Sequence, residues 1–167
     1  MLLGFLIWLE NLTPFIDLRS SAYVYPIVLA LHLTAISLFG AMIVATDLRL
    51  IGLTLTDSSF AQVIVELRWP KRIGFFFAAT CGFLLFASNA ETYYYNRYFR
   101  IKVLLFVLVA IHAVIFRRSV YARLENGAMP VRGSKVAASL SLALWTGILF
   151  AGRAIGYVEG RSGLHLR

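Results

Sequence analysis

The stretch "YPIVLALHLTAISLFG", residues 25–40, is a continuous apolar run with one histidine, His32, near its middle. It is part of a longer apolar segment, residues 23–46, which exceeds the roughly 20 residues that a helix needs to cross a bilayer. Lipid cannot satisfy the hydrogen bonds of an open backbone, so a segment of this kind must be helical. The run therefore predicts a transmembrane helix, in which the imidazole of His32 is the one group that packing alone does not explain.

Three further segments repeat this pattern, at residues 73–88, 101–116 and 136–157. The chain of 167 residues is 60% hydrophobic and 14% charged, with a mean hydropathy of +0.78, whereas a soluble domain is nearer half apolar and a quarter charged. The basic residues that give the net charge of +8 flank the apolar runs. This placement favours membrane topology and anionic lipid headgroups, and not nucleic-acid binding, as the reason for the charge. We expect an all-α chain, a single membrane domain over residues 1–167 that forms an integral membrane four-helix bundle.

The opening "MLLGFLIWLENLTPFIDLRS", residues 1–20, is too short to span a bilayer because Glu10 and Pro14 interrupt it. It has neither a basic leader nor a small-residue cleavage site, which argues against a removable signal peptide. Apolar residues nevertheless recur in it at helical spacing, so we expect a short N-terminal helix in the membrane interface. A helix packed over the mouth of the bundle is the alternative. The members of this apolar series are Leu2, Phe5, Trp8, Leu9 and Leu12.

The basic residues predict the orientation. The two loops expected between the first and second spans and between the third and fourth spans hold nine of them, against five to seven on the opposite side. By the positive-inside rule these two loops are cytoplasmic and both termini are periplasmic. The nine are Arg49, Arg68, Lys71, Arg72, Arg117, Arg118, Arg123, Arg132 and Lys135.

Small residues recur about four apart in three of the predicted spans. Stripes of this kind let helices approach closely in lipid, where packing replaces the hydrophobic drive. We expect them to mark helix contacts and nothing more. The stripes are Thr34, Ser37 and Ala41 in the first span, Gly74, Ala78 and Gly82 in the second, and Ser139, Ala143, Gly147 and Ala151 in the fourth.

A second embedded histidine, His112, lies in the third span. At 1.5 Å per residue, His32 and His112 lie about 14 and 18 Å from the outer face, and spans one and three run in the same direction. In an up-down bundle the diagonal between these spans is about 14 Å, which is too long for direct contact but suits a flat metallocofactor. Two neutral imidazoles on opposite sides of an iron would hold b-type haem. Lys102 and Arg153, near the outer ends of their spans, could pair with the haem propionates.

The alternative for each histidine is a hydrogen bond across helices, to a carbonyl or to Thr34, Thr80, Ser139 or Ser141. The single cysteine, Cys81, allows neither an intramolecular disulfide nor a cysteine-based metal site, so haem is the metal centre that the composition favours. The segment "SNAETYYYNRYFRIK", residues 88–102, is typical of an interfacial aromatic belt, and a headgroup or quinone pocket using Glu91, Asn96 and Lys102 is its alternative reading. No nucleophile with a base, phosphate loop or carboxylate pair is present, so we predict no catalytic activity of its own.

Four stretches together carry a resemblance: "WLENLTPFIDLRSSAYVYPIVLALHLTAISLFG", "DLRLIGL", "YNRYFRIKVLL" and "LWTGILFAGRAIGY". With them the chain resembles an uncharacterised family of small bacterial inner-membrane proteins, known as a domain of unknown function with four predicted spans. The resemblance implies a fold and a location but no activity. More loosely, the chain is similar to four-helix membrane cytochrome b and copper-resistance membrane proteins, through a histidine in a small-residue-rich span. The family resemblance places His32, Asp47, Arg49, Lys102 and Arg153 at motif positions.

These observations lead to two hypotheses of function. The first is a small subunit of the bacterial inner membrane that binds haem b through His32 and His112 and passes electrons to a quinone or a redox partner protein. The second is a non-redox scaffold, assembly factor or small transporter component whose histidines only stabilise packing.

Overall fold

The computed structural model describes residues 1–55, 57, 59–116 and 132–162, with side chains as far as Tyr157. Over this part of the chain every regular element is a helix, which confirms the predicted all-α class. The basic linker over residues 117–131, which carries three of the bases used for the orientation, lies outside the described residues. The tail with His165 lies outside them as well.

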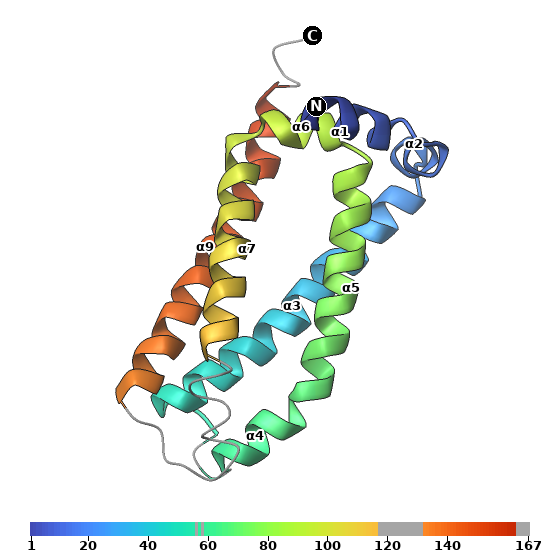
Figure 1. Cartoon of the computed structure of the whole chain (residues 1–167). Coiled ribbons are helices and arrows are strands. Elements are labelled where there is room, and N and C mark those ends of the chain that lie inside the picture. Colours follow the sequence, from blue (N-terminus) through green and yellow to red (C-terminus); the bar gives the residue numbers. More distant parts are fainter. Residues whose placement is uncertain (56, 58, 117–131, 163–167) are drawn as a thin grey trace. The chain divides into compact units, whose positions relative to one another are not determined.

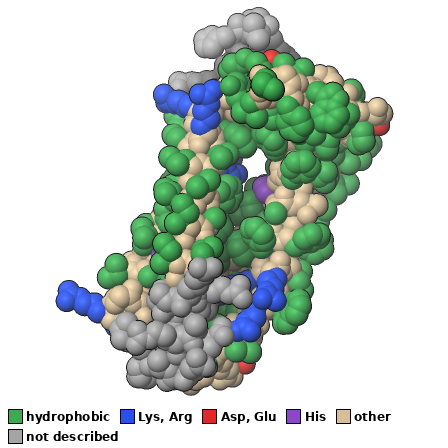
Figure 2. Space-filling view, in the orientation of Figure 1, with side chains coloured by type: hydrophobic (Ala, Val, Ile, Leu, Met, Phe, Trp, Pro, Cys, Tyr) green, Lys and Arg blue, Asp and Glu red, His purple; other side chains and the backbone are tan. Residues whose placement is uncertain are grey.

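Four helices of the described chain are long and apolar enough to cross a membrane, which confirms the predicted number of spans (Figure 1). On the face seen in Figure 2, hydrophobic side chains cover most of the long helices, and most of the visible Lys and Arg lie towards helix ends. The elements are α1 (Leu2–Glu10), α2 (Thr13–Ser20), α3 (Val24–Ile51), α4 (Phe60–Glu66), α5 (Arg68–Ala87), α6 (Ala90–Tyr95), α7 (Arg97–Phe116) and α9 (Arg132–Ser162).

The long helices extend further than the apolar runs that predicted them. Residues 47–51 were expected to lie in a loop but form the last turns of α3, which ends at Gly52, whose φ is +97°. The amide of Leu53 donates to the carbonyl of Leu48 over 2.9 Å. This bond and the left-handed glycine form a helix C-cap that satisfies the last carbonyls. Likewise α5 begins at Arg68 and α7 at Arg97, because charged residues at the ends of an apolar helix can continue its backbone bonds.

The N-terminal segment forms two short helices, α1 and α2, rather than one. Asn11 and Leu12 separate them, and Pro14 occupies the first turn of α2, a position where the missing proline N–H removes no helix bond. Leu6 and Leu9 are buried on α1, which packs against α6, while Leu2, Phe5 and Trp8 are exposed. One face of α1 is therefore packed against α6, and its other face is apolar and exposed.

Contacts divide the described chain into two compact units. The first comprises residues 1–42 and 69–96, which include α1, α2, α6 and most of α3 and α5. The second comprises residues 43–68 and everything from residue 97 onward, where α7 and α9 pack side by side. The second unit also holds an apolar core cluster built from four helices: Leu50, Ile51, Phe60, Ile64, Phe116, Ala137 and Ala138.

Candidate functional site

The imidazole of His32, on α3, forms a hydrogen bond to the neighbouring helix of the first unit. Its Nδ1 lies 2.9 Å from the carbonyl oxygen of Ala78 on α5. Because a carbonyl can only accept, Nδ1 must carry the proton and donate it. The neutral ring then has its lone pair on Nε2, which is the tautomer that a metal-ligating histidine adopts when a carbonyl orients it.

The small-residue stripe of α5 faces α3 at this point, as the sequence predicted. A Cβ atom built on Gly82 would lie 2.8 Å from Cε1 of His32, and one on Gly74 would lie 3.2 Å from Cβ of Phe39. Both distances are shorter than ordinary carbon–carbon contact. The stripe therefore provides the space in which α3 places the imidazole and the Phe39 ring against α5.

His112, on α7 of the second unit, lies in different surroundings. Its ring stacks on Phe116 with centroids 5.5 Å apart and planes 26° apart. The backbone of Ala137 on α9 lies close enough to interact with the ring, but the buried Nε2 atom makes no hydrogen bond of ordinary geometry. A buried nitrogen left in this state costs roughly 1–3 kcal/mol, so His112 has an unused ligand atom in an apolar environment.

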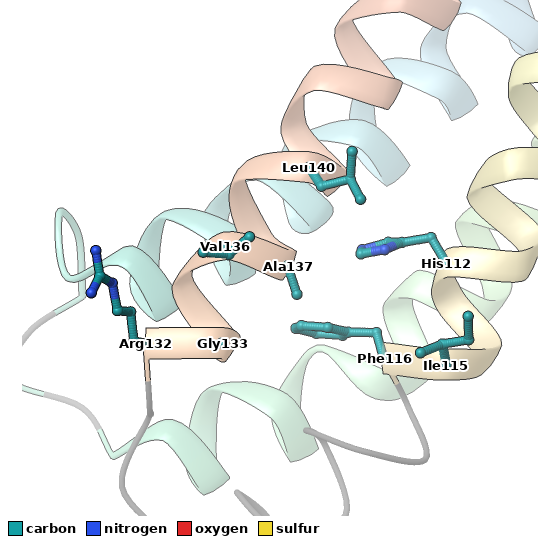
Figure 3. A pocket seen from close by; sticks show the side chains of 8 residues that line it. All are labelled: His112, Ile115, Phe116, Arg132, Gly133, Val136, Ala137 and Leu140. Atoms are coloured by element: carbon teal, nitrogen blue, oxygen red, sulfur yellow. The ribbon is translucent and has the colours of Figure 1, made fainter.

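A cavity of about 480 Å³ lies beside His112, between the last turn of α7 and the first turns of α9 (Figure 3). The His112 and Phe116 side chains extend from α7 towards Ala137 and Leu140 on α9. Among the described residues, the lining is mostly apolar, and Arg132 is the only Lys, Arg, Asp or Glu in it. Nothing in the sequence pattern predicted this cavity, because Phe116 and Ala137 belong to ordinary apolar runs.

The two cations assigned to cofactor binding, Lys102 and Arg153, lie in the second unit at the α7–α9 contact. A Cβ atom built on Gly152 would lie 3.4 Å from Nζ of Lys102, so the ammonium group packs directly over that glycine. The guanidinium carbon of Arg153 lies 4.8 Å from the centre of the Tyr157 ring, a cation–π distance. Neither α7 nor α9 as far as Tyr157 contains an Asp or Glu, so the two helices present positive charge without an acid of their own.

The "DLRL" motif forms the buried end of α3 in the second unit. Thr46, Asp47 and Arg49 have exposed fractions of 2%, 3% and 9%. The guanidinium carbon of Arg49 lies 3.8 Å from the centre of the Phe60 ring on α4. The motif thus joins α3 to α4 beside the apolar cluster, where buried charge has to be held by neighbouring groups.

Glu10 was not expected to have a role, and it joins three elements of the first unit. Its Oε1 lies 2.8 Å from Nη1 of Arg19 on α2. Its Oε2 accepts a hydrogen bond of 2.7 Å from the backbone amide of Glu91 in the first turn of α6. Of the residues proposed for a quinone or headgroup pocket, Glu91 and Asn96 lie in this unit and Lys102 in the other.

The histidine pair is divided between the two units, with His32 in the first and His112 in the second. Among the described residues, no three His, Cys, Asp or Glu side chains lie close enough together to hold a metal ion. Each imidazole does meet a local requirement for a haem ligand. His32 donates from Nδ1 to a backbone carbonyl, and His112 has a buried nitrogen that makes no hydrogen bond.

Comparison with known proteins gives a family without an activity. A family of unknown function (DUF6644) matches residues 8–158. No curated protein and no solved structure gives a significant match to the chain. The matched range contains all four long apolar helices except the last residues of α9, together with His32, His112, Lys102 and Arg153. The chain, with its four helices long and apolar enough to cross a membrane, therefore belongs to this family of unknown function.

Proposed function

We propose that this protein is a small multi-pass subunit that binds b-type haem through Nε2 of His32 and Nε2 of His112. The observation that carries the proposal is the state of His112, whose buried Nε2 makes no hydrogen bond. A bond to iron would satisfy that atom and remove the cost of its burial. The proton that His32 holds on Nδ1 leaves Nε2 as the atom for the second bond.

Lys102 and Arg153 would take the two propionate groups. Both are cations on apolar helices, and the neighbouring stretches of α7 and α9 supply no carboxylate to pair with them. Charge-assisted hydrogen bonds to propionate oxygens would offset the cost of holding these cations within spans. The ammonium group of Lys102 packs over Gly152 on the neighbouring helix.

Bound haem supplies one-electron chemistry at an iron whose potential its ligands and surroundings set. The protein's contribution is to present two neutral imidazoles, exclude water from the iron, and neutralise the propionates. In this proposal the protein exchanges electrons with a quinone or a redox partner protein and catalyses no reaction of its own.

The test is the absorption spectrum of the full-length protein purified from haem-replete cells, with the haem type identified by its pyridine complex. We expect a Soret band in the wild type and its loss in His32→Gln and His112→Phe. Each variant is chosen to keep the fold: a glutamine amide can still donate to the Ala78 carbonyl, and a phenyl ring can still stack on Phe116. His165→Ala, which removes the histidine of the tail, is the matched control and should keep the band.

A non-redox role is the second candidate, and one observation favours it. The hydrogen bond between His32 and Ala78 already gives that imidazole a structural purpose, the joining of α3 to α5. A folded, colourless wild-type protein that takes up no added haem would overturn the haem proposal and leave a helical scaffold, assembly factor or small transporter component.

We also propose that the protein lies in a bacterial inner membrane with both termini in the periplasm. The support is the excess of Lys and Arg in the two loops on the other side of the spans. Fusion of an enzyme that is active only in the periplasm to the C-terminus should give activity. The same reporter inserted after Gly52 should give none, and the reverse pattern would contradict this orientation.

A further inference from the structure

We infer that Gly82 is a positioning residue, which fixes the ring of His32 so that Nε2 is its ligand atom. The inference rests on the proposed function, and it assigns a role to a residue that does not itself touch the cofactor. Two contacts of the ring support it, the hydrogen bond from Nδ1 to Ala78 and the close approach of the ring to Gly82.

The first contact is the bond from Nδ1 of His32 to the Ala78 carbonyl, at 2.9 Å. In an α-helix this carbonyl points towards residue 82, four positions on, whose amide it normally accepts. Every Cα–Cβ bond in a helix is tilted towards the N-terminus. A side chain at position 82 would therefore project towards the carbonyl that His32 uses.

The second contact shows that this space is occupied. A Cβ atom at position 82 would lie 2.8 Å from Cε1, 3.4 Å from Nδ1 and 3.6 Å from Nε2 of His32. The distance to Cε1 is too short for two carbon atoms, so a methyl group at position 82 would force the ring to shift, while the two nitrogens would lie at ordinary contact distance. Of the described glycines, Gly40 offers the contrast, since a Cβ there would meet nothing within 4 Å.

The chemical consequence concerns the choice of ring nitrogen. A neutral histidine can carry its proton on either nitrogen, and the hydrogen bond at one of them decides which one remains a ligand. Glycine at 82 lets the ring come close enough to donate from Nδ1 to a carbonyl that is rigid within α5. A methyl group there would push the ring away and lengthen the bond from Nδ1 to the carbonyl. The proton could then lie on either ring nitrogen.

The first measurement needs no cofactor: ¹⁵N NMR of the His32 ring in haem-free protein. We expect the wild type and Gly40→Ala to show a protonated Nδ1 and an unprotonated Nε2. Gly82→Ala should show a mixture of the two tautomers or the reverse assignment. A wild-type ring that is protonated on Nε2 overturns the inference without any variant, so the test holds even if Gly82→Ala folds poorly.

The second measurement is haem affinity, by titration of haem into the same three proteins. Loss of an outer-shell partner of a metal ligand typically weakens metal affinity about 10–100-fold, and we expect a loss in this range for Gly82→Ala and none for Gly40→Ala. Equal affinity and equal tautomers in the two variants would overturn the inference while leaving the proposed function in place. Absence of haem binding by the wild type would overturn the proposed function, and the tautomer measurement would still decide whether Gly82 orients the ring.

Discussion

The glycines of α5 and those of α9 serve the same purpose, close helix approach, but they face different kinds of neighbour. On α5, Gly74 faces the Cβ and Cα atoms of Phe39, and Gly82 faces an imidazole ring. On α9, Gly147 faces the methyl ends of Leu105, and Gly152 faces the ammonium end of Lys102. Atoms near the backbone move only with the backbone, and the His32 ring can move only by lengthening its bond to Ala78, whereas the end of a long side chain can rotate aside. We therefore expect alanine to be less well tolerated at the glycines of α5 than at those of α9.

The two units also differ in what they bury. The second unit has a cluster of large apolar side chains from α3, α4 and α7, which packs against Ala137 and Ala138 of α9. The fully buried residues of the first unit are small, with Ala87, Ser88 and Ala90 at 0% exposure. Large side chains leave large cavities when truncated, whereas small residues allow only overpacking. Truncation should thus harm the second unit most, and enlargement the first.

The largest effect is expected from Leu50→Ala in the second unit. Leu50 is 1% exposed and contacts the other members of the cluster, so its truncation should cost about 2–4 kcal/mol of unfolding free energy. Unfolding in mixed micelles by titration with a denaturing detergent measures this. Leu53→Ala, at a residue 68% exposed, is the control and should change little. Equal losses in the two variants would show that the cluster does not stabilise this unit.

The second prediction compares Gly74→Ala with Gly147→Ala by the same titration. Alanine gains about 1 kcal/mol over glycine in a helix. The alanine Cβ at position 147 would lie 3.3 Å from a methyl carbon of Leu105, which can rotate aside, so that gain should remain. The alanine Cβ at position 74 would lie 3.2 Å from Cβ of Phe39, which moves only with its backbone. Overpacking of this kind costs about 1–3 kcal/mol. Gly74→Ala should lower the unfolding free energy and Gly147→Ala should not. Effects of the same sign and size would show that the glycines of α5 and α9 tolerate alanine equally.

The sequence predicted the four spans because their physical cause, a long run of apolar residues, is local. It also predicted the packed stripe of small residues on α5, where Gly74 and Gly82 contact α3, but the stripe predicted on the first span was wrong, because Thr34, Ser37 and Ala41 are all exposed. It could not predict that Ala78 accepts the bond from His32, because any backbone carbonyl can do so and only tertiary placement selects one. Nor could it predict the role of Glu10, whose partners Arg19 and Glu91 are 9 and 81 residues away.

The third prediction concerns Glu10, the polar connection of the first unit. Glu10→Gln removes the charge that pairs with Arg19 over 2.8 Å but keeps an oxygen that can accept from the Glu91 amide. A partly exposed ion pair contributes about 0.2–1 kcal/mol, so we expect a loss of that size, confined to α1 and α2. Hydrogen exchange should quicken there and stay unchanged in α7 and α9. Faster exchange across both units would mean that Glu10 supports the whole fold.

The smallest effect is expected at the start of α4, where the second unit relies on a local bond. The Ser59 side-chain oxygen accepts a hydrogen bond of 3.1 Å from the Gln62 amide, which caps the helix. Loss of such a cap costs about 0.5–2 kcal/mol. The low end applies here, because Val63 and Ile64 still bury the helix against its neighbours.

Ser59→Ala should therefore cost about 0.5 kcal/mol, and Ser59→Asp, which restores an acceptor at the N-cap, should recover it. The same titration used for Leu50→Ala measures both variants. The free energy lost in Ser59→Ala is then compared with that lost in Leu50→Ala. A cap effect close to that of Leu50→Ala would mean that the second unit depends on local helix formation. A cap effect several-fold smaller would mean that the cluster of large side chains stabilises the second unit. The first unit has other contacts in that role, namely those of its glycines, of His32 and of Glu10.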